Sequence, residues 1–259
     1  MTSTAERASA LLALHTDPRL LTLVNVWDVA SARVVAETPG TTALATASHA
    51  IAAAYGYDDG EQIPRDLMLE AVGRVVDAVE LPVTADLEAG YGDAAETVRR
   101  AIGLGVVGCN IEDQLKPLAE AAAVVESVMN AADAEGVPDF VLNARTDAYL
   151  RAGDRDPHEV LADAITRVTA YLDAGAPVVF VPGRVVEEHV VALVDALGPG
   201  RLTMLPVPGC PSLARLEELG VARASFGPYP QRVALTALQE MVEGVGRGEG
   251  IPDGTRPLT

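Results

Sequence analysis

The sequence predicts a (β/α)₈ barrel from three observations: the chain length, eight alternating strand and helix segments, and glycine-containing helix ends that recur along the chain. The chain has 259 residues, close to the roughly 250 residues typical of this fold. No linker rich in proline, glycine or serine divides it, so we expect one domain over residues 1–259. Hydrophobic residues make up 49% of the chain and aromatic residues only 4%. Alanine, valine, leucine and isoleucine must therefore fill the core.

Short β-branched runs alternate with longer segments of helical periodicity, which is the pattern of βα units around a parallel sheet. Several helical segments end at a glycine before the next strand, as in GLGVVG, LDAGAPVV and ELGVARAS. A doubly wound open sheet also alternates, but it usually has five or six strands and often opens with a GxGxxG turn, which is absent after the first strand. The eight predicted strands are Leu21–Val26, Thr42–Ala45, Pro82–Ala85, Val106–Ile111, Phe140–Ala144, Pro177–Val181, Leu202–Leu205 and Ala222–Ser225.

The charge and the cysteine content narrow the classes of function. A formal net charge of −18 argues against nucleic acids and anionic membranes as partners, because both would be repelled. The first 20 residues carry charges, and no apolar run approaches the ~18 residues of a membrane span, so we expect a cytoplasmic protein. Cys109 and Cys210 form no CxxC or Cys/His cluster, and a reduced intracellular chain needs no disulfide. Small molecules remain as the expected ligands.

Polar side chains with the same strand parity lie at the ends of three consecutive predicted strands. Residues two apart share a face of a barrel strand, and the carboxyl ends of barrel strands carry the active sites of such enzymes. The intervening residues are apolar and are expected to face the helices. Solvated loop residues are the alternative, since Asp and Asn are common where strands end. The in-phase sets are Thr84, Asp86 and Glu88; Asn110 and Glu112; and Asn143 and Arg145.

Three converging carboxylates would raise one another's pKa unless a cation neutralised them. Oxygen ligands of this type suit Mg²⁺ or Mn²⁺. The sequence therefore predicts a metal site formed by Asp86, Glu88 and Glu112. Arg145 beside them offers a planar fork for a substrate carboxylate, so a metal and a guanidinium could together hold a 2-oxo acid.

The stretches PVTADLEAGYGD, GCNIEDQ and NARTDAYL resemble the isocitrate lyase/phosphoenolpyruvate mutase superfamily. NVWDVASARVV, ATASHAIAAAYGYDDG and SFGPYPQR extend the resemblance over nearly the whole chain. The resemblance implies a (β/α)₈ barrel, usually a tetramer in which the last helix is exchanged between subunits. It also implies Mg²⁺-dependent making or breaking of a C–C or P–C bond through the enolate of a 2-oxo acid. The apolar segment Ala234–Val245 is consistent with such an exchanged helix.

The resemblance also implies roles for single residues. Asp86 is similar to the direct metal ligand, and Glu112 to the glutamate that holds the metal, often through water. Glu88 stands where the family has a second aspartate, and this departure moves the carboxylate outward by about one bond length. Asp59 is similar to an acidic residue that joins the network, and Arg145 to the arginine that binds the substrate carboxylate. The remaining expected pocket residues are Thr46, Ala47 and Ser48, where small residues bring backbone amides to the substrate, and Asn110 and Asn143.

The segment after Glu112 reads EDQLKPLAEAAAVVE and differs from both main branches of the family. The isocitrate and methylisocitrate lyases carry a catalytic cysteine in a K-[KR]-C-G-H loop, which is absent here. The mutases and phosphonopyruvate hydrolases resemble EDKLFPK followed by Thr/Asn gating residues, and Leu118 and Glu120 stand where their Lys and Asn would be. Lys116 is two positions early and is interpreted as a solvated charge. The loop is interpreted as shortened into the next helix.

The leading hypothesis is a Mg²⁺-dependent lyase that acts on a small 2-hydroxy or 2-oxo carboxylate, with Arg145, Asp59 and Glu112 as the expected catalytic set. A P–C bond enzyme, either a phosphonomutase or a phosphonopyruvate hydrolase, is the first alternative. A non-catalytic barrel that binds a carboxylate is the second. His49 is interpreted with equal weight as a pocket residue and as a loop histidine, whereas His158 and His189 are expected on the surface.

Overall fold

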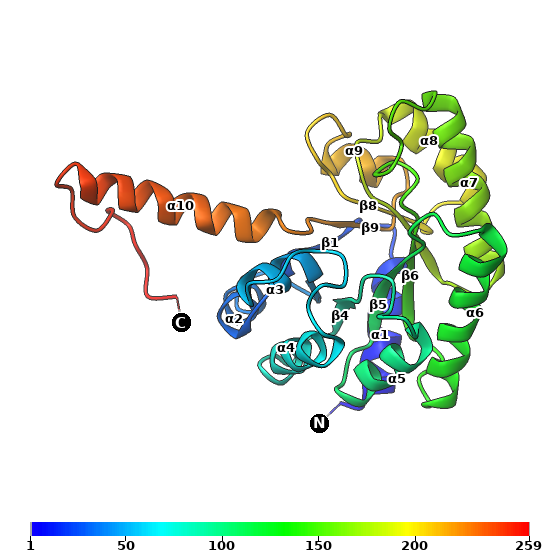
Figure 1. Cartoon of the computed structure of the whole chain (residues 1–259), viewed down its shortest axis with the longest axis horizontal. Coiled ribbons are helices and arrows are strands. Elements are labelled where there is room, and N and C mark those ends of the chain that lie inside the picture. The colour runs from blue at the N-terminus through cyan, green and yellow to red at the C-terminus, as the bar shows by residue number, and fades with distance from the viewer. Residues whose placement is uncertain (1, 259) are drawn as a thin grey trace.

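The computed structural model describes residues 2–258 and shows a barrel of parallel strands surrounded by helices (Figure 1). The strands follow the order β1-β9-β8-β7-β6-β5-β4-β3-β2 around the barrel. β1 pairs with β9 and β2 pairs with β3, so the sheet comes round on itself at the break between β1 and β2. The predicted barrel is confirmed. The strands are β1 (Leu21–Leu23), β2 (Asn25–Val26), β3 (Leu44–Thr46), β4 (Val83–Asp86), β5 (Gly108–Glu112), β6 (Val141–Arg145), β7 (Val178–Val181), β8 (Leu202–Met204) and β9 (Arg223–Ser225).

Helices connect and cover the strands on the outside of the barrel, as expected from the alternation in the sequence. Asp93 and Asp156 cap two of them by accepting hydrogen bonds from first-turn amides. None of the described helices combines the length and apolarity that a membrane crossing needs. The helices are α1 (Thr4–Thr16), α2 (Val29–Ala36), α3 (Ser48–Ala54), α4 (Arg65–Asp77), α5 (Ala94–Gly103), α6 (Leu118–Ala134), α7 (Pro157–Asp173), α8 (Glu187–Leu197), α9 (Leu213–Glu218) and α10 (Tyr229–Gly246).

The predicted strands are present, but several are displaced toward the C-terminus. The first predicted strand is divided at Val24, and β4, β5 and β6 each end one residue later than predicted, at Asp86, Glu112 and Arg145. These polar residues continue the ladder because each has a partner across the sheet: Asp86 pairs with Asn110 and Glu112 with Arg145. Asp86, Glu112 and Arg145 are therefore the last residues of their strands, whereas Glu88 lies in the turn after β4.

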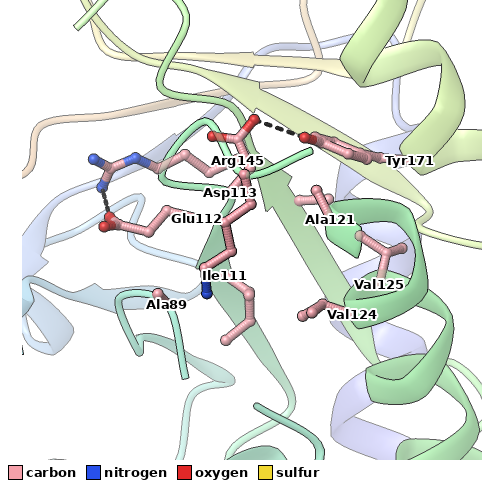
Figure 2. A pocket seen from close by; sticks show the side chains of 11 residues that line it. Ala89, Ile111, Glu112, Asp113, Ala121, Val124, Val125, Arg145 and Tyr171 are labelled. Atoms are coloured by element: carbon pink, nitrogen blue, oxygen red, sulfur yellow. Dashed lines mark hydrogen bonds and ion pairs between the residues drawn. The ribbon is translucent and has the colours of Figure 1, made fainter. Parts of the chain in front are cut away.

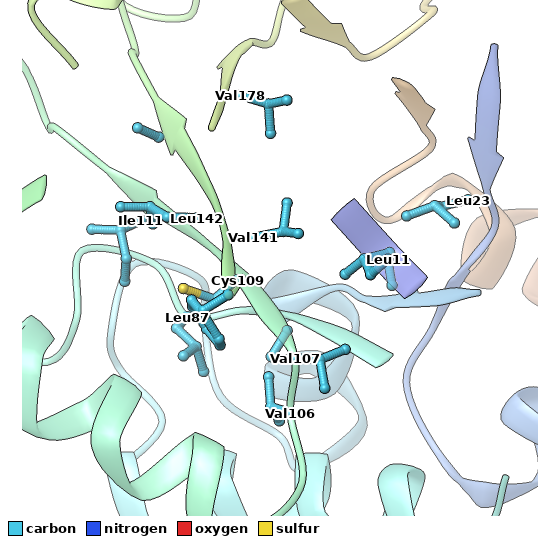
Figure 3. Close-up of a cluster of buried hydrophobic side chains, with 14 of the residues drawn as sticks. Leu11, Leu23, Leu87, Val106, Val107, Cys109, Ile111, Val141, Leu142 and Val178 are labelled. Atoms are coloured by element: carbon cyan, nitrogen blue, oxygen red, sulfur yellow. The ribbon is translucent and has the colours of Figure 1, made fainter. Parts of the chain in front are cut away.

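Helix α1 closes the amino-terminal end of the barrel against the start of β5. Leu11 is fully buried there, and Figure 3 shows it in the cluster with Val107, Cys109 and Val141. A Cβ atom on Gly108 would lie 2.7 Å from the carbonyl oxygen of Val141 and 3.0 Å from Leu11 Cδ2. Such distances are too short for a packed interior. Glycine at this position therefore lets α1 seal the barrel end opposite the candidate site.

Helix α10 projects away from the barrel (Figure 1). It is held at its start by Gln231, whose side-chain amide donates to the Ala50 carbonyl at 2.8 Å. Farther along, large apolar side chains are more than half exposed, at Val233, Leu238 and Val242. An apolar face of this kind is unusual on an isolated soluble helix. The expected exchange of this helix between subunits stays a prediction.

The expectation that His189 lies on the surface is wrong. The side chain is buried, and its Nδ1 atom lies 2.8 Å from the hydroxyl oxygen of Tyr149. The neighbouring Glu187 and Glu188 suggested an exposed helical run, but His189 lies on the helix face turned toward the loop that carries Tyr149. His158 is exposed, as predicted.

Candidate active site

Six of the predicted site residues line an open pocket at the carboxyl ends of the strands, whereas Thr46, Ala47, Glu88, Glu112 and Asn143 are not part of its lining. The pocket has a volume of about 240 Å³ and is open to solvent. Polar side chains from β4, β5 and β6 reach it, together with residues of the loops that follow β3 and β9. Apolar side chains line another part of the wall, among them Phe180, Pro182 and Leu205. The polar lining includes Ser48, His49, Asp59, Asp86, Asn110 and Arg145.

Asp86 ends β4 and keeps one oxygen without a partner. Its Oδ2 atom accepts hydrogen bonds from the Ser48 amide at 3.1 Å and the Ser48 hydroxyl at 2.8 Å. Its own amide donates to Thr46 Oγ1 at 3.0 Å. Oδ1 is buried and has no hydrogen-bond partner among the described residues. A carboxylate oxygen left in this state needs a cation or a donor, so Asp86 is oriented as a ligand.

Glu88 lies in the turn after β4 and is almost fully buried. Both of its oxygens have partners: Oε1 accepts from the Tyr91 hydroxyl at 2.8 Å, and Oε2 accepts from the Glu61 amide. Burial raises the pKa of Glu88, the two hydrogen bonds lower it, and the charges of Asp86 and Asp59 raise it again, with a net shift upward. In this geometry the Glu88 carboxylate faces Tyr91 and Glu61.

Glu112, Arg145 and Asp147 form a buried chain of charges at the ends of β5 and β6. Arg145 Nη1 lies 2.8 Å from Glu112 Oε2 (Figure 2). On the other side, Asp147 Oδ1 accepts from Arg145 Nε at 2.9 Å and lies 2.8 Å from Nη2. Burial raises the pKa of Glu112 to about 7, although the charge of Arg145 acts in the opposite direction. Asp147 therefore fixes the plane of the Arg145 guanidinium, and Glu112 pairs with the Nη1 end of the same guanidinium.

Asp113 follows Glu112 but points away from the pocket, toward the helices. Its carboxylate accepts from the Tyr171 hydroxyl at 2.6 Å (Figure 2) and from the Asp147 amide at 3.0 Å. Arg167 Nη1 lies 3.2 Å away. Burial alone would raise the pKa of Asp113, but these hydrogen bonds lower it below its ordinary value. Asp113 thus anchors the β5 and β6 loops to α7 and supports the positions of Arg145 and Asp147.

The sequence predicted neither Asp113 nor Asp147 as a site residue. Asp147 was within reach of the parity argument, because it continues the in-phase series of Asn143 and Arg145. Asp113 is out of phase with Glu112, and its partner Tyr171 lies 58 positions away in the chain. Strand parity alone gives no signal for such a residue.

Some of the other expected pocket residues line the pocket, and others are buried behind it. Asn110 lines the pocket, whereas Asn143 is fully buried and donates from Nδ2 to Asn110 Oδ1 at 2.8 Å. The Ala47 amide donates to the Val26 carbonyl at 3.2 Å, and the Ser48 amide is engaged by Asp86, so both amides already have partners within the chain. Thr46 is fully buried and supports Asp86.

His49 and Asp59 come together at the pocket rim. His49 Nδ1 lies 3.3 Å from Asp59 Oδ2, and both side chains are substantially exposed. Asp59 belongs to the loop between α3 and α4, not to the end of a strand, and it lines the pocket from that loop. The two residues can therefore respond to a ligand without the cost of breaking a buried network.

The acidic residues suit a hydrated Mg²⁺ ion better than a closed cage of protein ligands. Across residues 2–258, no group of three or more His, Cys, Asp or Glu side chains converges to hold a metal ion. Mg²⁺ usually keeps several water ligands and takes only one or two protein carboxylates. The free Oδ1 of Asp86 supplies one such ligand, and Glu112 lines the neighbouring space. The residues present thus fit a metal held directly by Asp86 and through water by its neighbours.

Comparisons with known proteins agree with this architecture. The phosphoenolpyruvate phosphomutase family model matches residues 11–246. An uncharacterized protein of Mycobacterium tuberculosis is 32% identical over 92% of this chain and 90% of its own length. Phosphoenolpyruvate phosphomutase of Streptomyces hygroscopicus is 30% identical over 90% of this chain and 78% of its own length. The 2-methylisocitrate lyase of Escherichia coli is 31% identical over 71% of this chain and 66% of its own length.

Solved structures give the same result. A protein of Burkholderia cenocepacia, named provisionally as a phosphonomutase, is 42% identical and superimposes with a TM-score of 0.86, covering 93% of this chain and 99% of its own. Oxaloacetate acetylhydrolase, solved with its product oxalate, is 26% identical with a TM-score of 0.85, covering 99% and 93%. The family model spans most of the barrel, and the relatives include both lyases and mutases. The chain therefore belongs to the phosphoenolpyruvate mutase/isocitrate lyase superfamily.

Proposed function

We propose that the chain is a Mg²⁺-dependent lyase that cleaves or forms a C–C bond in a small 2-hydroxy or 2-oxo carboxylate. Its relatives support an activity on a C–C or P–C bond, of the lyase or mutase type. One observation carries the finer proposal: Arg145, held by Asp147, lines the same pocket as Asp86, whose Oδ1 has no hydrogen-bond partner among the described residues. A carboxylate and an adjacent α-oxygen are the groups that such a pair would hold.

The roles of the residues follow from these contacts. Arg145 binds the substrate carboxylate, and Asp147 keeps the guanidinium plane fixed so that little side-chain freedom is lost on binding. Mg²⁺, when bound at Asp86, stabilises negative charge that develops on the substrate α-oxygen. Glu112 is paired with Arg145, Asp59 lines the same pocket as Asp86, and the Glu88 carboxylate is held by Tyr91 and Glu61. With a pKa of about 7, the Glu112 carboxyl can hold or release a proton near neutral pH.

One part of the pocket wall suits a carbon substituent. Phe180, Pro182 and Leu205 line it, and apolar side chains suit a small alkyl group or an uncharged leaving fragment. A transferred phosphoryl group would need several donors or cations around it, and on the polar part of the wall Arg232 lies in addition to Arg145. The helix that follows β5 begins at Leu118, which leaves only five residues after Glu112 for a gating loop.

P–C bond chemistry is the second candidate, because the family model and the 42% identical structure carry phosphomutase names. A panel of 2-oxo, 2-hydroxy and phosphono acids with Mg²⁺, analysed by ¹H and ³¹P NMR, separates the candidates. Cleavage of a hydroxy- or oxo-dicarboxylate supports the lyase. Turnover of a phosphono acid alone would overturn it, and ligand binding without any product would identify a non-catalytic barrel.

The metal assignment has its own test. The Asp86→Asn substitution keeps the shape and the hydrogen bond from Ser48 but removes the ligand charge. We expect Mn²⁺ affinity, measured by calorimetry, to fall at least a hundredfold while the circular dichroism spectrum is kept. Asp77→Asn, on the outer helix α4, is the matched control. Equal Mn²⁺ binding by the Asp86 variant and the wild type would remove Asp86 as the ligand.

A further inference from the structure

Two hydrogen bonds join the loop that carries Asp59 to the turn that carries Glu88, and a third lies within that turn. The first segment, the Asp59 loop, covers residues 55–64 between α3 and α4, and the second, the β4–α5 turn, covers residues 87–93. The Glu61 amide donates to Glu88 Oε2, and the Tyr91 hydroxyl donates to Glu88 Oε1 at 2.8 Å. The Tyr91 amide donates to Glu61 Oε1 at 2.5 Å. These contacts close a ring between Glu61, Glu88 and Tyr91.

All three residues of this ring have left-handed backbones. The φ angles are 62° at Glu61, 53° at Glu88 and 56° at Tyr91. An L-residue with a side chain pays about 1 kcal/mol or more for this conformation, and glycine would adopt it without that cost. The side chains of Glu88 and Glu61 each accept a hydrogen bond from an amide of the other segment, and the Tyr91 hydroxyl donates to Glu88 within the turn. The side-chain contacts therefore offset the backbone strain.

The ring also accounts for glutamate at position 88. Both oxygens of Glu88 are used, and the side chain is only 3% exposed, whereas Asp86 two residues earlier keeps a free oxygen. An aspartate at position 88 would be shorter by one methylene, or roughly 1.5 Å, and could not accept from both Tyr91 and the Glu61 amide. The longer side chain thus reaches the neighbouring loop.

Closing the ring places Asp59. This residue lies two positions before Glu61, lines the pocket, and is paired with His49 across 3.3 Å. The Asp59 side chain is about half exposed and has no buried contacts of its own to fix it. The attachment of Glu61 to Glu88 restrains the chain two residues after Asp59.

We propose that Glu88, Glu61 and Tyr91 form a latch that holds the Asp59 loop over the pocket, so that Glu88 and Glu61 are positioning residues for Asp59. The role of Asp59 in ligand binding rests on the proposed function. The latch itself is a property of the metal-free chain. Opening it moves Asp59 away from the pocket without altering Asp86 or Arg145.

The latch is tested first in the metal-free protein by hydrogen–deuterium exchange of the Asp59 loop. Glu88→Asp and Tyr91→Phe each remove a hydrogen bond that involves a carboxylate, so we expect amide exchange in residues 55–64 to rise about tenfold. Tyr57→Phe, an exposed tyrosine in the same loop, is the matched control and should leave exchange unchanged. If Glu88→Asp also leaves the loop protected, the latch does not exist.

The positioning role is tested by a double-mutant cycle on binding of oxalate in the presence of Mn²⁺. In the wild type, Asp59→Asn is expected to change oxalate affinity severalfold. In the Glu61→Ala background, Asp59 is displaced, and the same substitution should have no further effect. Asp58→Ala, in the same loop, should leave the effect of Asp59→Asn intact. Additive effects of Glu61→Ala and Asp59→Asn would overturn the positioning role.

The two experiments separate failure of the latch from failure of the proposed function. A wild-type chain that binds neither Mn²⁺ nor oxalate would refute the proposed function and, with it, the positioning of Asp59 for a ligand. The physical latch would still be decided by the exchange of the Asp59 loop. Faster exchange together with unchanged oxalate binding would show a ring that stabilises the loop only, and the positioning role would be rejected.

Discussion

Glu112 is buried at the end of β5, and its ionisation should make the stability of the protein depend on pH. Only 11% of its side chain is exposed. Burial raises the pKa of Glu112 from its ordinary value of 4.5 to about 7. The charge of Arg145 lowers this pKa, and the charges of Asp147, Asp86 and Glu88 act in the same direction as burial. The folded protein therefore binds the Glu112 proton more tightly than the unfolded chain does.

The direction and the size of the pH dependence follow from the difference between the folded and the unfolded pKa of Glu112. The Glu112 contribution to the free energy of unfolding is fully present below pH 4.5 and is lost as pH rises through about 7. The difference between a pKa of 4.5 in the unfolded chain and about 7 in the folded protein corresponds to about 3 kcal/mol in the free energy of unfolding. About 2 to 3 kcal/mol of this should be lost between pH 5 and pH 8. Glutamine at this position has the shape of the protonated acid and does not ionise. Glu112→Gln should therefore gain stability over the wild type as pH rises.

The assay is urea unfolding of both proteins in the presence of EDTA, at several pH values from 5 to 8. Subtracting the two curves cancels the titration of the other carboxylates. Glu126→Gln, an exposed position on α6, is the control and should follow the wild type at every pH. If the wild type and Glu112→Gln differ by the same amount at pH 5 and pH 8, the Glu112 carboxyl does not titrate with a raised pKa, and the electrostatic account of this pocket fails.

Three further predictions address the rest of the molecule. Asp147→Asn, which weakens the hold on Arg145, should lower oxalate affinity in the presence of Mn²⁺ about tenfold; unchanged affinity in calorimetry would mean that Asp147 does not orient the arginine. Arg223→Met should raise the free energy of unfolding, measured in urea, by about 1 to 3 kcal/mol. The reason is that the Arg223 guanidinium is fully buried and its three nitrogens have no hydrogen-bond partners among residues 2–258. A loss of stability in this variant would show that the buried charge is compensated. Val242→Glu, on the exposed apolar face of α10, should lower the mass measured by light scattering if subunits associate through this helix, and an unchanged mass would exclude that association.

The strands could be predicted from the sequence because short apolar segments alternate with helical segments that end at glycine. The residues at which the strands end could not be predicted. Asp86, Glu112 and Arg145 were expected just beyond their strands, since charged residues ordinarily lie in loops. In the structure they end the strands, because the register brings Glu112 opposite Arg145 and Asp86 opposite Asn110. The sequence of a single strand does not show which residue will lie opposite on the neighbouring strand.

The position of the candidate site could be predicted from strand parity, but the state of each carboxylate could not. Parity treated Asp86, Glu88 and Glu112 as equivalent. The structure gives Asp86 a free oxygen, ties Glu88 to Glu61 and Tyr91, and pairs Glu112 with Arg145. The Glu88 contact depends on a loop residue 27 positions away in the chain, and the Glu112 contact depends on a residue of the next strand. Tertiary contacts, which a local pattern does not contain, therefore decide which carboxylate remains available for a metal.

The net charge of −18 and an anionic substrate are compatible because charges act over different distances inside and outside the barrel. At physiological ionic strength, surface charges are screened beyond about 8 Å, so the acidic exterior has little effect on a small anion until it reaches the pocket. There, Arg145 lies in a partly desolvated site, and the charge of the buried Arg223 reaches Asp86. Electrostatic interactions are stronger in such an environment. The acidic composition is therefore compatible with the small carboxylate substrate proposed above.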